Sequence, residues 1–172
     1  MTSSSQKARL LDQREVLLRI RRLAYQIGER HYKSPEIFLL GVHPQGALLS
    51  ELLWKFLKEI SPALVHRQIV RLKKKVELPS ETHFKLNIQP EKIRQKPVVI
   101  VDDVLNTGRT TTHILHHLLP HNPSSIEVTV LVERKHTIYP VKASYSGIVL
   151  HDTLNNHVSV SLDDKKEVFL HP

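Results

Sequence analysis

Apolar and polar residues follow two alternating patterns along this chain, and the alternation predicts an α/β fold. From Asp12 to about Tyr32 apolar residues recur at helical spacing. Further helices are predicted over 47–60 and about 109–119. Apolar runs predict strands over 37–42, 63–70, 98–101 and 126–132, with shorter β segments over 143–150, 157–162 and 167–171. Strands that alternate with helices indicate a mainly parallel sheet with helices on both faces.

The length of 172 residues predicts a single domain over 1–172, because a chain of this size buries a full core of its own. Residues 1–9 are mostly polar and are expected to be disordered. Residues 71–96 have no clean periodicity and contain Pro79 and Pro90, so they are expected to form a flexible loop.

Composition narrows the class of protein. No run approaches the roughly 18 apolar residues that span a membrane, and the N-terminus lacks the apolar core of a secretory signal. The chain has no cysteine, which excludes disulfides, thiolate metal sites and a thiol nucleophile. We therefore expect a cytoplasmic protein with no membrane partner. The formal net charge of +8 favours phosphorylated or polyanionic partners.

The run from Val98 to Thr112 carries the most chemical information. Four β-branched residues precede Asp102 and Asp103, and a hydroxyl-rich turn then opens into a helix. Carboxylates accept hydrogen bonds from ribose hydroxyls, while the backbone N–H groups of Thr107 to Thr111 and the helix dipole favour a phosphate. The alternative is a strand-to-helix turn whose aspartates only cap the helix.

This run resembles the ribose-5-phosphate loop of type I phosphoribosyltransferases, and it is most similar to the pyrimidine operon regulator/uracil phosphoribosyltransferase (PyrR) branch. The segments that carry the resemblance elsewhere are 22–27, 123–126, 130–134 and 141–147, in matching order. The resemblance implies the type I fold, which is a parallel sheet with helices on both faces and a small C-terminal hood over the base.

The resemblance also implies a reaction. A nucleobase nitrogen displaces pyrophosphate from C1 of phosphoribosyl pyrophosphate (PRPP), which brings Mg²⁺ as its cofactor. Asp102 and Asp103 would hold the ribose hydroxyls, with Asp103 near the reacting nitrogen. The 5′-phosphate would be bound by Thr107, Gly108, Arg109, Thr110 and Thr111. Arg134 matches a catalytic position near base and pyrophosphate, although its type and place fit a surface cation equally well.

The turn after the first strand matches the family's pyrophosphate loop, which is formed here by His43, Pro44, Gln45 and Gly46. Ala47-Leu48 follows instead of Lys-Ser/Thr, so the turn is not a nucleotide P-loop. In the family this loop often has a cis peptide, and X-Pro is the bond that adopts cis most readily, so the resemblance predicts a cis His43–Pro44 peptide. Gln45 stands where an arginine is usual, and a plain strand-to-helix connection is the alternative for this turn.

The predicted base-facing part of the hood is Ile148, Val149 and Leu150. Ile148 stands where a lysine is usual and His151 where a proline is usual, while Lys135 replaces a glycine and Asn106 an aromatic residue. The flexible catalytic loop of the family is not recognisable in 71–80. These departures affect base recognition and leaving-group handling more than they affect ribose phosphate binding.

A basic cluster of Arg71, Lys73, Lys74 and Lys75 has three interpretations: a pyrophosphate contact, an RNA contact or a solvated face. The leading functional hypothesis is a uracil phosphoribosyltransferase that gives UMP and pyrophosphate. One alternative is a non-catalytic RNA-binding regulator that senses a nucleotide and binds mRNA, and another is a purine phosphoribosyltransferase. The resemblance implies a homodimer.

Overall fold

A computed structural model describes residues 7–72, 84–85, 89–151 and 156–171. Within these ranges the main sheet has six strands in the order β4-β3-β2-β5-β6-β7. The strands, in chain order, are β2 (Glu36–Val42), β3 (Leu64–Leu72), β4 (Phe84–Lys85), β5 (Pro97–Leu105), β6 (Ser125–Arg134) and β7 (Tyr145–Leu150). All neighbouring pairs are parallel except β3 with β4. The predicted α/β class is confirmed.

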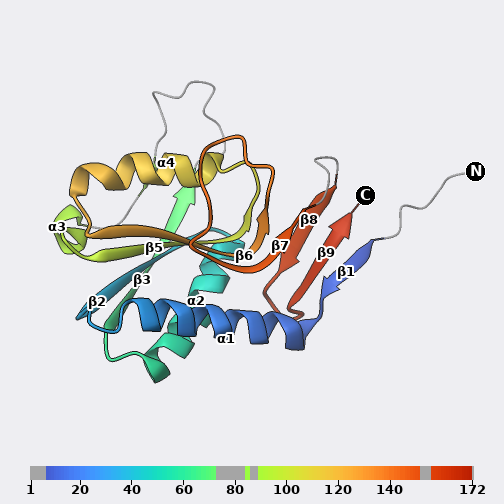
Figure 1. Ribbon diagram of the computed structural model, residues 1–172, viewed down its shortest axis with the longest axis horizontal. Coiled ribbons are helices and arrows are strands. Elements are labelled where there is room, and N and C mark those ends of the chain that lie inside the picture. Colours follow the sequence, from blue (N-terminus) through green and yellow to red (C-terminus); the bar gives the residue numbers. More distant parts are fainter. Residues whose placement is uncertain (1–6, 73–83, 86–88, 152–155, 172) are drawn as a thin grey trace, which may run out of the picture.

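Helices cover both faces of this sheet (Figure 1). They are α1 (Gln13–Arg30) and α2 (Gln45–Ile60) on one face and α4 (Arg109–Leu118) on the other, with the short α3 (Pro90–Ile93) and η2 (Leu119–His121). Because side chains alternate along a strand, Ile37 and Leu39 pack toward α1 and α2, whereas Phe38 and Leu40 join the cluster under α4. The near-continuous apolar strands of the sequence are thus explained by burial on both faces.

A second, antiparallel sheet forms the hood. In the part of the chain that the structure describes, it has three strands in the order β1-β9-β8, namely β1 (Ala8–Leu11), β8 (His157–Ser161) and β9 (Glu167–His171). Its apolar side chains, such as Val158 and Val168, belong to the same core as α1 and α2. The predicted C-terminal hood is therefore present, and the N-terminal strand contributes to it.

Two boundary predictions need correction. Ala8 and Arg9 were expected to be disordered, but they lie in β1, where pairing with β9 satisfies the backbone. The expected loop over 71–96 also contains structure: Arg71 continues β3 and pairs with Lys85 of β4, and Ile93 of α3 is fully buried. β1 is held by β9, which is distant in sequence, and Ile93 packs into the core cluster with residues of other strands and α4; local periodicity reveals neither contact. Residues 73–83 and 86–88 of that loop lie outside the described residues.

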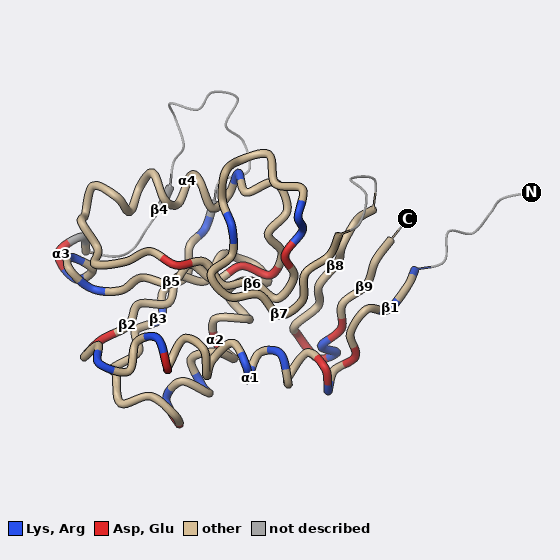
Figure 2. The backbone as a smooth tube through the Cα atoms, in the orientation of Figure 1, with Lys and Arg blue, Asp and Glu red and all other residues tan. Residues whose placement is uncertain are grey.

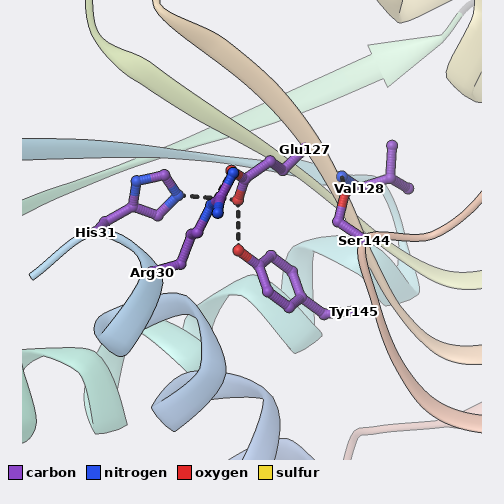
Figure 3. A network of polar contacts seen from close by, with 6 residues as sticks. All are labelled: Arg30, His31, Glu127, Val128, Ser144 and Tyr145. Carbon is purple, nitrogen blue, oxygen red and sulfur yellow. Dashed lines mark hydrogen bonds and ion pairs between the residues drawn. The ribbon is translucent and has the colours of Figure 1, made fainter.

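Helix α1 is fixed at both ends by polar contacts. At its start, Asp12 and Glu15 form a capping box, with each side chain accepting from the other's backbone N–H at 2.9 Å. At its end, the Glu127 carboxylate of β6 lies 2.9 Å from His31 Nε2 and accepts a 2.6 Å hydrogen bond from the Tyr145 hydroxyl (Figure 3). The capping box stabilises the start of the helix, and the contact between His31 and Glu127 ties its end to the sheet. No helix in the described ranges is both long and apolar enough to cross a membrane.

The Glu127 contacts predict an acid-dependent loss of stability. Burial alone would raise the pKa of Glu127, but hydrogen bonds from His31 and Tyr145 bring it below its usual value of 4.5. A lowered folded pKa stabilises the fold above the unfolded pKa, and this contribution disappears as pH falls below 4.5. Glu127→Gln is expected to cost about 1.5–3 kcal/mol near neutral pH and less in acid.

Urea unfolding of wild type and Glu127→Gln across this pH range measures the difference. Glu59→Gln, at an exposed position of α2, is the matched control and should unfold like wild type at each pH. A Glu127→Gln penalty that stays constant into acid would contradict the assignment.

Candidate active site

The register of the parallel sheet brings four predicted site segments to one edge. Gly41 of β2 lies opposite Val101 of β5, and Asp102 lies opposite Val130 of β6. Arg134 at the end of β6 lies opposite Leu150 at the end of β7. Since parallel strands end at the same edge, the turns that follow them are neighbours there, as is usual for ligand sites of such sheets.

The predicted pyrophosphate loop connects β2 to α2 at this edge. Its His43–Pro44 peptide is cis, which confirms the prediction, and the His43 N–H donates a 2.9 Å hydrogen bond to the Val70 carbonyl of β3. Gly46 lies directly against β5: a Cβ added there would be 2.9 Å from the Asp102 Cα. The loop and the acidic pair therefore touch through backbone, and a glycine is required at the contact.

The acidic pair lies inside β5 rather than after it, which corrects the strand end predicted at residue 101. Pairing with β6 continues through Leu105 and keeps both aspartates in the strand. The Asp103 N–H donates a 2.9 Å hydrogen bond to Asp102 Oδ1. Desolvation by the surrounding protein and, next, the nearby Asp103 carboxylate raise the pKa of Asp102 well above its usual value. A bound cation would reverse this effect.

The predicted phosphate loop forms a small cavity between β5 and α4. Its volume is about 60 Å³, and its lining includes Asp102 and the whole run from Asn106 to Thr111. Gly108 precedes α4 with φ of +80°, a left-handed conformation that favours glycine. The first-turn N–H groups of α4 therefore begin at the cavity, where a helix N-terminus favours an anion.

A segment that the sequence reasoning missed supports this loop from outside. The N–H groups of Ile138 and Tyr139 both donate to the Thr107 carbonyl at 3.0 Å. A Cβ on Gly108 would lie 3.4 Å from the Tyr139 Cβ and 3.5 Å from that of Val141. No periodicity marks this irregular stretch, and its role depends on the turn that follows β6.

Arg134 is not a surface cation. Its residue is 4% exposed, and its Nη1 donates to the Asn106 Oδ1 of the phosphate loop at 3.3 Å. Asn106 provides the acceptor. The structure thus places a buried positive charge beside the loop that is expected to receive a phosphate.

The other predicted site residues lie in different parts of the molecule. Ile148, Val149 and Leu150 were expected in the hood, but they lie in β7, at one edge of the main sheet, because this run pairs with β6. Arg71 is exposed near the end of β3, whereas Lys73, Lys74 and Lys75 lie outside the described residues. The Gln45 side chain of the pyrophosphate loop accepts a hydrogen bond from the hood at Leu162.

The donor set at this edge suits a cation that arrives with a ligand. Among the described residues no group of three His, Asp or Glu side chains is arranged to hold a metal ion. Mg²⁺ is commonly bound through one or two carboxylates plus substrate phosphates and waters. Asp102 and Asp103 fit that pattern, and the raised pKa of Asp102 shows that its ionised form would gain from such a cation.

Comparisons with known proteins agree with this geometry. Residues 6–165 match the family described as phosphoribosyl transferase domain. The chain is 32% identical over 156 residues to the bifunctional protein PyrR of Haemophilus ducreyi, covering 88% of this chain and 87% of that protein. It is 30% identical over 167 residues to the bifunctional protein PyrR of Bacillus subtilis, covering 93% and 92%.

Among solved structures, the hypoxanthine phosphoribosyltransferase of Trypanosoma cruzi in complex with IMP aligns with a TM-score of 0.82. The alignment covers 100% of this chain and 97% of that one at 17% identity, so it supports the fold alone. The family match, the PyrR relatives and the common fold lead to one conclusion: this chain belongs to the phosphoribosyltransferase family and has its type I fold.

Proposed function

We propose that this protein transfers ribose 5-phosphate from PRPP to uracil and releases UMP and pyrophosphate, as a step of nucleotide salvage. The observation that carries the proposal is that the phosphate cavity, the acidic pair and the pyrophosphate loop lie in contact at one edge of the sheet. The phosphate cavity includes Asp102 in its lining, and Asp102 touches Gly46 of the pyrophosphate loop. In PRPP the ribose lies between the 5′-phosphate and the 1-pyrophosphate. The site offers a partner for each in the same order: the cavity, the acidic pair and the pyrophosphate loop.

In this proposal the phosphate cavity binds the 5′-phosphate, and the acidic pair accepts hydrogen bonds from the ribose hydroxyls. The base nitrogen forms a bond to C1 while the C1–O bond to pyrophosphate breaks, and the electron pair leaves with pyrophosphate. The proton of the base nitrogen passes to Asp103. Mg²⁺ bound with PRPP supplies positive charge to the leaving group. The residues act by position and electrostatics, because charge develops on both sides of C1.

Arg134 adds a fixed positive charge to the same edge. It lies opposite Leu150 in the register and hydrogen-bonds to the phosphate loop through Asn106. A buried guanidinium in this position favours the negative charge of the phosphate and of the departing pyrophosphate. In the proposal Ile148, Val149 and Leu150, on the neighbouring strand end, line the side where the base enters.

Pyrophosphate release from PRPP, measured with uracil, hypoxanthine or guanine as acceptor, tests the proposal. We expect steady-state turnover with uracil and much less with the two purines, while reactions without a base or without PRPP serve as controls. Turnover with a purine and not with uracil would show that the base substrate is a purine. PRPP binding without turnover on any base would overturn the enzymatic proposal.

A second candidate function follows from the exposed arginines of α1. Figure 2 marks basic positions in blue along the backbone of α1; in this helix they are arginines, and Arg14 and Arg21 are among the exposed ones. In this alternative the protein is an RNA-binding regulator that keeps the nucleotide pocket as a sensor. If turnover is absent, the alternative requires RNA binding that weakens steeply as salt rises, since phosphate contacts release counterions.

A further inference from the structure

One hydrogen bond joins the pyrophosphate loop to the hood. The Gln45 Oε1 accepts from the Leu162 N–H at 3.0 Å, across 117 positions of sequence. Gln45 begins α2 at the proposed active site, and Leu162 directly follows β8 of the hood. The two sheets of the molecule therefore meet through a side chain of the loop expected to hold the leaving group.

The hood side of this contact is firmly fixed. Leu162 is 3% exposed, and its side chain belongs to the core shared by α1, α2 and the hood. A backbone N–H in such surroundings needs a partner, because an unpaired buried donor costs free energy. The Gln45 amide supplies it, so the Gln45 side chain is held wherever the hood holds Leu162.

The loop side is fixed by its neighbour in sequence. Gly46 lies against β5 so closely that an added Cβ would be 2.5 Å from the Val101 carbonyl oxygen. A shift of Gln45 toward or away from the hood must therefore change the contact between Gly46 and the strand that carries Asp102. The hydrogen bond at Gln45 thus links the hood to the loop, and the backbone contact at Gly46 links the loop to the strand that carries the acidic pair.

We infer that Gln45 is a positioning residue that couples the hood to the pyrophosphate loop. With Leu162 bonded, the loop lies where it receives pyrophosphate against the acidic pair; when the bond breaks, the start of α2 loses its side-chain hydrogen bond to the hood. The inference rests on the proposed function for the identity of the ligand. The coupling must be reciprocal. A ligand that orders the loop protects the Leu162 N–H from hydrogen exchange, and loss of the hydrogen bond lowers the affinity for that ligand.

Hydrogen exchange at the Leu162 N–H, resolved by NMR, tests the bond directly. Gln45→Met removes the acceptor at similar side-chain length, and we expect the exchange rate to rise about fivefold to tenfold. Gln45→Glu keeps an oxygen at the same place and should leave the exchange slow. Gln26→Met, at an exposed position of α1, is the matched control and should also change nothing. Unchanged exchange in Gln45→Met would overturn the inference.

Binding of Mg²⁺-pyrophosphate, measured by calorimetry, tests the coupling. Saturating pyrophosphate should slow Leu162 exchange in wild type and in Gln26→Met but not in Gln45→Met, whose affinity should fall by about the same fivefold to tenfold. Faster exchange with unchanged affinity would reduce Gln45 to a structural contact and overturn the coupling. A wild-type protein that turns over PRPP while Gln45→Met binds normally overturns this inference alone. A wild-type protein that binds neither PRPP nor pyrophosphate overturns the proposed function together with it.

Discussion

Asp102→Asn is expected to lower the rate of pyrophosphate release by about 100-fold or more while leaving the protein at least as stable as wild type. The loss follows from the site: Asp102 lines the phosphate cavity, touches Gly46 and is proposed to hold the ribose hydroxyls. Asparagine keeps the shape and the oxygen that accepts from the Asp103 N–H, but it lacks the charge that Mg²⁺-PRPP requires.

The stability part of this prediction follows from the direction of the pKa shift. Burial and then Asp103 raise the pKa of Asp102 in the folded protein above its ordinary value of 3.8. The folded state therefore holds the proton more tightly than the unfolded state, and ionisation of Asp102 destabilises the fold increasingly as pH rises from 3.8 toward the folded pKa. A neutral amide avoids this cost, so the melting temperature should not fall near neutral pH.

Steady-state kinetics and calorimetric melting measure the two effects on the same samples. Asp164→Asn makes the same change at an exposed residue after β8 and should leave both rate and melting temperature unchanged. Asp103→Asn should also lose turnover, because the proposal gives its carboxylate the proton of the base nitrogen. Near-normal turnover of Asp102→Asn would contradict the placement of the ribose beside this pair.

Gly46→Ala is expected to impair both folding and PRPP binding, although it adds one methyl group. The added Cβ would lie 2.5 Å from the Val101 carbonyl oxygen and 2.9 Å from the Asp102 Cα, and both are backbone atoms of a central strand. Since the strand has no room to move, the loop must shift. We expect a cost of about 1–3 kcal/mol in unfolding free energy and, from misplacement of the loop, up to about a 100-fold loss of PRPP affinity.

The same substitution in α1 is a natural comparison. A Cβ on Gly28 would lie 3.5 Å from the Leu57 Cδ2, an ordinary van der Waals distance, so Gly28→Ala should be tolerated and can gain helix propensity. Chemical denaturation and calorimetric titration with PRPP separate the two variants. Equal affinities in Gly46→Ala and Gly28→Ala would show that the loop does not touch the ligand.

The chemistry of the site was easier to predict from sequence than its contacts. The run from Asp102 to Thr111 is continuous, so its order of strand, carboxylates, turn and helix N-terminus can be predicted from neighbouring residues alone. The cis His43–Pro44 peptide was predicted from the resemblance of this turn to the family's pyrophosphate loop, together with the low cost of cis at an X-Pro bond. Both predictions rest on a short, continuous run of residues.

What sequence reasoning missed depends on residues far apart in the chain. The end of β5 is set by hydrogen bonds to β6, and the position of Ile148 is set by pairing of β7 with the same strand. The burial of Arg134 and its bond to Asn106 require both strand ends to be placed first. The bond of Gln45 to Leu162 joins two segments that share no pattern, so only the folded structure reveals it.

The pairing of β1 with β9 has a consequence for how the molecule is made. Ala8 lies opposite Leu170, so the middle strand of the hood is synthesised well after β1, which is one of its two partners. Closing so long a loop is slow, whereas the βαβ unit of β5, α4 and β6 closes over a short distance. During synthesis the phosphate-binding half can take shape early, and β1 must wait, unpaired, for the strand that completes the sheet.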